Sequence, residues 1–217
     1  MSQPVQSIQI PLFPLPVVVF PGEALPLHVF EDRYKEMLQF CLATTPPRLI
    51  GINLVSEGKE ITPIGCAVRI DRIVNQYPDG RVDVLTVGTE RYELERMVRT
   101  KTFAEGMVRF LPDSRATEPI KNQQKAIALH GKLLELVKGS PPTHNFSEDA
   151  AVSYALAHDA GLEMQDRQAL LELRAEQERI DFLIEYFHRI LPTVLEREEL
   201  QERIRANGYF RKFLSPL

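Results

Sequence analysis

The segment from residue 10 to residue 38, IPLFPLPVVVFPGEALPLHVFEDRYKEML, constrains the fold of this chain more than any other. It carries prolines among apolar and β-branched residues. Pro11 and Pro14 have no N–H to donate to a neighbouring strand, so the first part predicts an edge strand or a bulged strand. After Phe30, apolar residues recur at helical spacing with charged residues between them, which predicts a helix. This opening is typical of a β-barrel.

Beyond this segment the sequence predicts short strands with a turn about every ten residues. Residues 48–55 are a continuous apolar run and predict a central strand. Further strands are expected over residues 64–74, 81–87, 91–98 and 103–111. Pro78-Asp79-Gly80 predicts a hairpin turn, because proline presets the first φ and glycine supplies the positive one. About six such strands predict a small antiparallel barrel or sandwich.

The character of the sequence changes at residues 112–119, and helical spacing follows. A single helix is expected over 165–191, which Pro192 ends or kinks, and a last charged helix over 196–206. Asn207-Gly208 is expected to stop that last helix. The fold class is therefore α+β, with a β-barrel part over residues 1–115 and a helical part over residues 116–217.

Composition excludes several classes of function. The net charge is −4 and neither half is basic, so non-specific phosphate binding has no electrostatic basis and a nucleic-acid partner is not expected. No apolar run is long enough to span a bilayer, and the first residues do not form a signal peptide. Cys41 and Cys66 form no CxxC and lie in apolar surroundings, which predicts buried reduced thiols in a cytoplasmic protein, with a structural disulfide as the alternative.

No catalytic motif is present in the sequence. It contains no phosphate-binding GxxxxGK[ST], no HExxH, no GxSxG and no GxGxxG, and its five histidines share no ligand spacing. We therefore expect no catalytic residue, no cofactor and no metal, and a protein that is not an enzyme.

Three other features each have a functional and a structural interpretation. The group Glu31-Asp32-Arg33 is either a carboxylate site or the start of a helix, and the helix start is favoured. Arg91-Tyr92 is either a binding element or a bend with a buried tyrosine and an ion-paired arginine, and the second is favoured. The aromatic tail over 209–217 either binds a partner or another subunit, or docks as an ordinary C-terminus, which is favoured.

These segments together resemble the N-terminal domain of the Lon protease family. The resemblance extends from about residue 8 to residue 192. The motifs that carry it are Phe20-Pro21-Gly22, Pro26-Leu27, Phe30-Glu31-Asp32-Arg33-Tyr34, Gly88-Thr89-Glu90-Arg91-Tyr92, Arg167-Gln168-Ala169-Leu170-Leu171-Glu172 and Glu178-Arg179-Ile180.

The resemblance implies a PUA-like pseudo-barrel followed by a helical bundle. It also implies, as an alternative to the single helix over 165–191, two helices that meet near Arg174. Full Lon proteases continue into an ATPase domain and a peptidase domain, whereas this sequence stops at Leu217 with neither, so a stand-alone, non-catalytic relative is expected.

Because that domain takes part in substrate recognition, the resemblance implies a module that binds exposed or unfolded polypeptide. A protease partner and a role as an adaptor in protein quality control are further expectations. An RNA-binding PUA-like protein is the alternative, against which the acidic balance argues. A small-molecule site or an enzymatic role is a third hypothesis that no assembled pocket supports. The residues expected to contact a peptide are Tyr77, Pro78, Tyr209 and Phe213. The oligomeric state is left open.

Overall fold

The computed structural model describes residues 7–55, 60–114, 118–139 and 151–213; within the last helix, side chains are described as far as Ile204, except at position 202. The strands are β1 (Ile8–Leu15), β2 (Ala24–Val29), β3 (Ile50–Leu54), β4 (Ile64–Gln76), β5 (Val82–Val98) and β6 (Glu105–Phe110). The helices are α1 (Asp32–Leu42), α2 (Gln123–Lys138), α3 (Val152–His158), α4 (Met164–Glu172) and α5 (Glu176–Phe213).

The six strands form one sheet that folds back on itself. Their order is β2-β5-β4-β3-β1-β6, and β5 also pairs with β6. The long strand β5 makes this possible, because its first part pairs with β2 and its last part pairs with β6. All pairs are antiparallel except β1 with β3. The predicted α+β fold, a pseudo-barrel followed by helices, is confirmed, with one parallel pair in place of an entirely antiparallel sheet.

The sequence predicted an edge strand or a bulged strand for β1, and the edge alternative is wrong. Residues 8–11 of β1 pair with β6 and residues 12–15 pair with β3, so the strand lies between two neighbours. Each half has a hydrogen-bonded partner on one side only. This arrangement accommodates Pro11 and Pro14, because a proline is tolerated where no N–H has to be donated.

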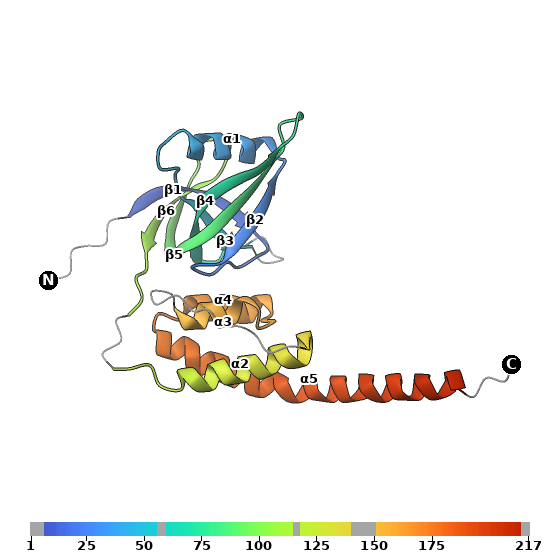
Figure 1. Ribbon diagram of the computed structural model, residues 1–217. Helices are drawn as coiled ribbons and strands as arrows, with labels where there is room; N and C mark the ends of the chain where they lie inside the picture. The colour runs from blue at the N-terminus through green and yellow to red at the C-terminus, as the bar shows by residue number, and fades with distance from the viewer. Residues whose placement is uncertain (1–6, 56–59, 115–117, 140–150, 214–217) are drawn as a thin grey trace.

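The helices lie on two sides of the barrel. In Figure 1, α1 packs against the upper end, and α2, α3, α4 and the first part of α5 form a layer beneath the barrel. One of two apolar clusters joins the two layers, since Phe20 and Val68 of the barrel belong to the same buried cluster as Leu156, Leu170 and Phe187 of the helices. The division at residue 115 stays a prediction.

The interruption near Arg174 is confirmed. Helix α4 ends at Glu172 and α5 begins at Glu176, because Leu173 takes an extended conformation with φ −68° and ψ 129°. The expected separate helix over 196–206 and its stop at Asn207-Gly208 are wrong. Helix α5 runs through Pro192, whose missing N–H costs one hydrogen bond in a helix that buried side chains hold in place.

Local predictions agree with the structure at the cysteines and at the first helix. Cys41 and Cys66 are buried and free, so the disulfide alternative is excluded. Glu31 precedes α1, and Arg33 pairs with it at 2.7 Å, as the helix-start interpretation requires. Lys35 pairs with Asp32 at 3.1 Å. Within the described residues, none of the helices combines the length and the apolar character needed to cross a membrane.

Candidate functional site

A cleft of about 500 Å³ opens where the barrel meets the helical layer. One wall comes from the barrel and from the chain just after β6, and the other comes from the start of α3. The lining residues are Pro21, Gly22, Thr89, Glu90, Arg91, Phe110, Leu111, Pro112, Asp113, Ala151 and Tyr154. Its volume lies within the ~300–1,000 Å³ typical of binding sites in proteins.

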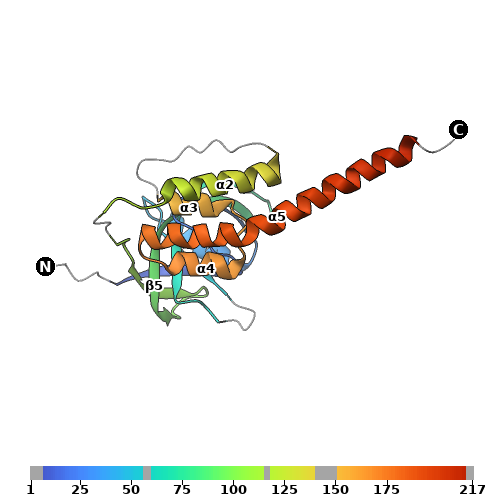
Figure 2. The ribbon, with the colours of Figure 1, turned by 90° about the horizontal axis from the view of Figure 1, so that it is seen from below.

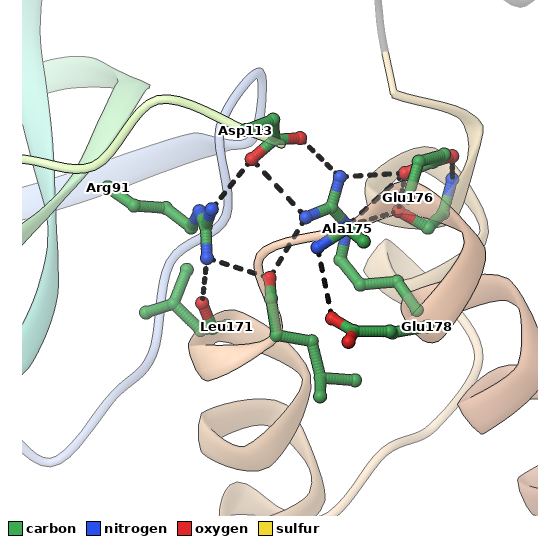
Figure 3. Close-up of polar contacts among 9 residues, drawn as sticks. Arg91, Asp113, Leu171, Ala175, Glu176 and Glu178 are labelled. Carbon is green, nitrogen blue, oxygen red and sulfur yellow. Dashed lines mark hydrogen bonds and ion pairs between the residues drawn. The ribbon is translucent and has the colours of Figure 1, made fainter. Parts of the chain in front are cut away.

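Arg91 fixes the barrel wall of the cleft to the helices. It lies on β5 with only 1% of its side chain exposed. Its guanidinium donates to the carbonyl oxygens of Leu171 and Leu173, at 2.9 and 2.7 Å, and to a carboxylate oxygen of Asp113 at 2.7 Å. Figure 3 shows Arg91 reaching Asp113 on one side and the end of α4 on the other.

Arg179 on α5 completes this cluster from the helical side. Its side chain is 0% exposed and donates to Asp113, to Glu176 at 2.8 Å and to Ser153 at 2.9 Å. It also donates to the Leu173 carbonyl at 3.0 Å. Burial alone lowers the pKa of Arg179, but the hydrogen bond and charge of Asp113 outweigh burial, so the pKa is raised and the group stays charged.

Tyr154 supplies an aromatic surface on the helical side of the cleft. Its ring stacks on Phe20 with centroids 5.4 Å apart, and the Arg179 guanidinium lies 4.4 Å from the ring centre. Its hydroxyl is buried and has no hydrogen-bond partner within the described ranges. Burial is the main cause of the raised pKa of Tyr154, so the phenol stays neutral.

A second cluster holds α3 and α4 against the barrel beside the cleft. Arg167 donates to both carboxylate oxygens of Glu23, at 2.7 and 2.6 Å, and to the Val18 carbonyl at 2.9 Å. The same guanidinium lies over the Phe20 ring at 4.4 Å. His158 pairs with Glu23 at 3.1 Å. The cleft is therefore bounded by two groups of side chains that keep its walls at a fixed separation.

The charges around the cleft are largely satisfied internally. The buried Arg91 and Arg179 donate hydrogen bonds to acceptors within the protein, and Glu90 at the cleft is exposed. What remains available to a ligand is the apolar surface of Phe110, Leu111 and Pro112 opposite Tyr154. In the part of the chain that is described, no group of three or more His, Cys, Asp and Glu residues could hold a metal ion. This arrangement suits binding of an apolar segment.

The structure does not bring the four predicted peptide-binding residues together at this cleft. Tyr77 and Pro78 lie at the β4–β5 hairpin, where Tyr77 is half-buried and donates to Asp83 at 2.8 Å, and Pro78 is exposed. Neither residue lines the cleft. Tyr209 and Phe213 lie on α5, and their side chains fall outside the described residues. The assignment of peptide contact to these four residues stays a prediction.

Sequence reasoning found part of the cluster. The interpretation of Arg91-Tyr92 as an ion-paired arginine beside a buried tyrosine is confirmed, although the two lie within a continuous strand rather than at a bend. Asp113 was missed because it lies in a segment with the composition of a linker. Arg179 was missed because an arginine in a helix is usually exposed. A signal available in the sequence was Glu178-Arg179-Ile180, one of the motifs that carry the resemblance.

The sequence pattern of the family described as "ATP-dependent protease La (LON) substrate-binding domain" matches residues 9–189. Two similar curated proteins are Lon proteases. The protein of Flavobacterium johnsoniae is 23% identical over 91% of this chain and 26% of its own length, and that of Xanthomonas oryzae is 24% identical over 94% and 25%. The chain thus spans about a quarter of the length of these relatives.

Two solved structures have the same fold. A Lon N-terminal domain protein from Xanthomonas campestris is 27% identical with a TM-score of 0.63, covering 82% of this chain and 98% of that one. The N-terminal domain of Mycobacterium avium complex Lon protease is 16% identical with a TM-score of 0.65, covering 83% and 98%.

Proposed function

We propose, because this chain belongs to the family of LON substrate-binding domains, that it is a non-catalytic module that binds exposed or unfolded segments of other polypeptides. The cleft between barrel and helices is the proposed binding site. We further propose that the module works as an adaptor that presents the bound segment to a protease, and that it does so in the cytoplasm.

One observation carries this proposal: the cleft offers apolar surface between walls that are held in place by buried, ion-paired arginines. A polypeptide segment gains about 25 cal/mol for each Å² of apolar surface that it buries there. The walls need not rearrange, because Asp113 and Glu23 already bind the arginines that position them. Preorganised walls reduce the entropy that binding costs.

The same observation argues against the RNA-binding alternative. Recognition of phosphate requires free cationic N–H groups. Arg91 and Arg179 direct theirs to Asp113, Leu173 and other protein acceptors, and the exposed Glu90 adds negative charge to the cleft.

The test measures binding of fluorescently labelled, reduced and carboxymethylated α-lactalbumin by anisotropy. Leu111→Glu places a charge on the apolar wall and is expected to weaken binding at least about tenfold. Leu42→Glu is the matched control, because Leu42 ends α1 on the far side of the barrel (Figure 1) and is also partly exposed. It is expected to leave affinity within about twofold.

Two further arms separate the hypotheses. Tyr77→Ala with Pro78→Ser tests the hairpin as the binding surface, and a loss of binding there with none in Leu111→Glu would move the site to the hairpin. Absence of any binding by the wild type overturns the polypeptide-binding function. Binding of labelled single-stranded RNA with a steep dependence on salt supports the alternative.

A further inference from the structure

Cations and anions are unequally exposed at the cleft between the barrel and the helices. Arg91 and Arg179 expose 1% and 0% of their side chains, whereas Asp113, which binds both, is 41% exposed. Figure 3 shows Asp113 between the two guanidinium groups. Glu90 also lines the cleft and is exposed. The charged groups of the lining that solvent reaches freely are therefore both carboxylates.

The Glu90 side chain forms no ion pair and no hydrogen bond with any residue that the structure describes. Its two nearest cations along the paired strands β5 and β6 are directed to other carboxylates. Arg91, the next residue, pairs with Asp113. Arg109 of β6 pairs with Glu93. A cationic group of a ligand can therefore pair with Glu90 without displacing a cation of the protein.

The apolar wall of the cleft lies directly beside these carboxylates. The Leu111 N–H donates to the Arg91 carbonyl at 2.8 Å, so the chain after β6 stays paired with β5. The same register places Pro112 across from Glu90, and Asp113 follows Pro112 in the chain. Apolar and anionic groups thus alternate along one edge of the cleft, and a segment bound there meets both.

We propose that the cleft selects polypeptide segments in which lysine or arginine adjoins apolar residues. This inference rests on the proposed function and names the class of segment that the site takes. Lysine and arginine fit because their aliphatic stems pack on apolar surface such as Leu111 while the charged end reaches a carboxylate. That charged end pairs with Glu90 or with Asp113. A segment with acidic residues in the same place meets like charge and is disfavoured.

Anisotropy of three labelled peptides tests the preference. Their sequence is Ser-X-Leu-Phe-Leu-X-Ser, in which X is lysine, glutamine or glutamate. The lysine peptide is expected to bind best and the glutamate peptide least, with dissociation constants at least about tenfold apart at about 20 mM salt. At about 500 mM salt the difference is expected to fall below about threefold, because salt screens exposed charges. A preference that salt leaves unchanged overturns the electrostatic basis of the proposal.

Glu90→Gln tests whether the preference arises at the cleft. It is expected to reduce the ratio of the glutamate and lysine dissociation constants at least about threefold. Glu135→Gln is the matched control, because Glu135 is exposed, does not line the cleft and its substitution changes the net charge equally. Figures 1 and 2 show the last turns of α2, which include Glu135, away from the segment that leads from β6 into α2.

The control Glu135→Gln is expected to keep the ratio of the wild type. An equal reduction in both variants means that the net charge of −4 sets the preference, and overturns the assignment to the cleft.

The outcomes separate this inference from the function on which it rests. Binding of the glutamine peptide that Leu111→Glu weakens supports the polypeptide-binding function at this cleft. If the lysine and glutamate peptides then bind equally, or the glutamate peptide binds better, the inference is overturned and that function stands. Absence of binding by all three peptides also overturns the inference, and the α-lactalbumin measurement then decides the function independently.

Discussion

Arg91 of β5 and Arg179 of α5 donate hydrogen bonds to the same two acceptors, the Asp113 carboxylate and the Leu173 carbonyl. One residue just after the barrel and one between two helices thus bind both arginines. Two buried guanidiniums repel each other unless an anion lies between them. The two arginines consequently share one carboxylate, and Arg179 has a second carboxylate partner in Glu176.

Asp113→Asn is expected to lower the free energy of unfolding by about 1.5–3 kcal/mol, because Arg91 loses its carboxylate partner while Arg179 keeps Glu176. Urea denaturation measures the change. Asp79→Asn is the control, since Asp79 pairs with Arg81 at an exposed turn where water screens the pair, and it is expected to leave the urea midpoint close to that of the wild type. Equal effects of the two substitutions would contradict a central role for Asp113.

Gly88→Ala is expected to destabilise the protein more than Gly22→Ala. A Cβ at position 88 would lie 2.1 Å from the carbonyl oxygen of Phe20, so the backbone would have to move. At Gly22 a Cβ has open space and only the positive φ of 83° is unfavourable, which costs about 1 kcal/mol. Thermal unfolding of both variants gives the comparison, and the order of their melting temperatures decides it.

Asp159→Asn is expected to reduce the loss of folding stability that the wild type shows at low pH. Burial raises the pKa of Asp159, but Lys138 and His130 outweigh burial, and the pKa is lowered in the folded protein. A lowered pKa means that the stabilisation is complete above the unfolded value of about 3.9 and is lost as the pH falls through the folded value. The stability difference between wild type and variant should therefore shrink below about pH 4. A difference that stays constant down to pH 2 would refute the assignment.

The thiols of Cys41 and Cys66 are expected to be unreactive in the native protein at pH 8. Burial is the main cause that raises the pKa of each thiol to about 12, so almost no thiolate is present. Titration with a disulfide reagent should show no rapid reaction until denaturant is added, after which both thiols react. Rapid labelling of the native protein would show that one of the two sites opens.

Elements set by neighbouring residues could be predicted from the sequence. The β4–β5 hairpin follows from Pro78-Asp79-Gly80, and the first helix follows from the acidic residues at its start. The position of β1 between β3 and β6 could not be predicted, because strand partners are chosen by contacts distant in sequence. The prolines of β1 show that two backbone N–H groups are missing, but they do not show which strand pairs with each half of β1.

The candidate site likewise has one part that the sequence predicts and one part that it does not. That Arg91 is ion-paired beside a buried Tyr92 could be inferred from the local pattern. Its partner Asp113 could not, because Asp113 reaches Arg91 through the pairing of β5 with β6, in which the Leu111 N–H donates to the Arg91 carbonyl at 2.8 Å. The course of α5 through Pro192 likewise depends on buried residues upstream of the proline, whose packing outweighs one lost hydrogen bond.

The interruption between α4 and α5 restricts where the chain tolerates added residues. A short connection between two helices ordinarily accepts insertions at little cost. Here the connection carries the Leu173 carbonyl, and one extra residue would carry that oxygen away from Arg91 and Arg179. The backbone N–H groups of Tyr77 and Gly80 donate to carbonyls within the hairpin itself. A tag or a probe is therefore better inserted in the hairpin than at Leu173.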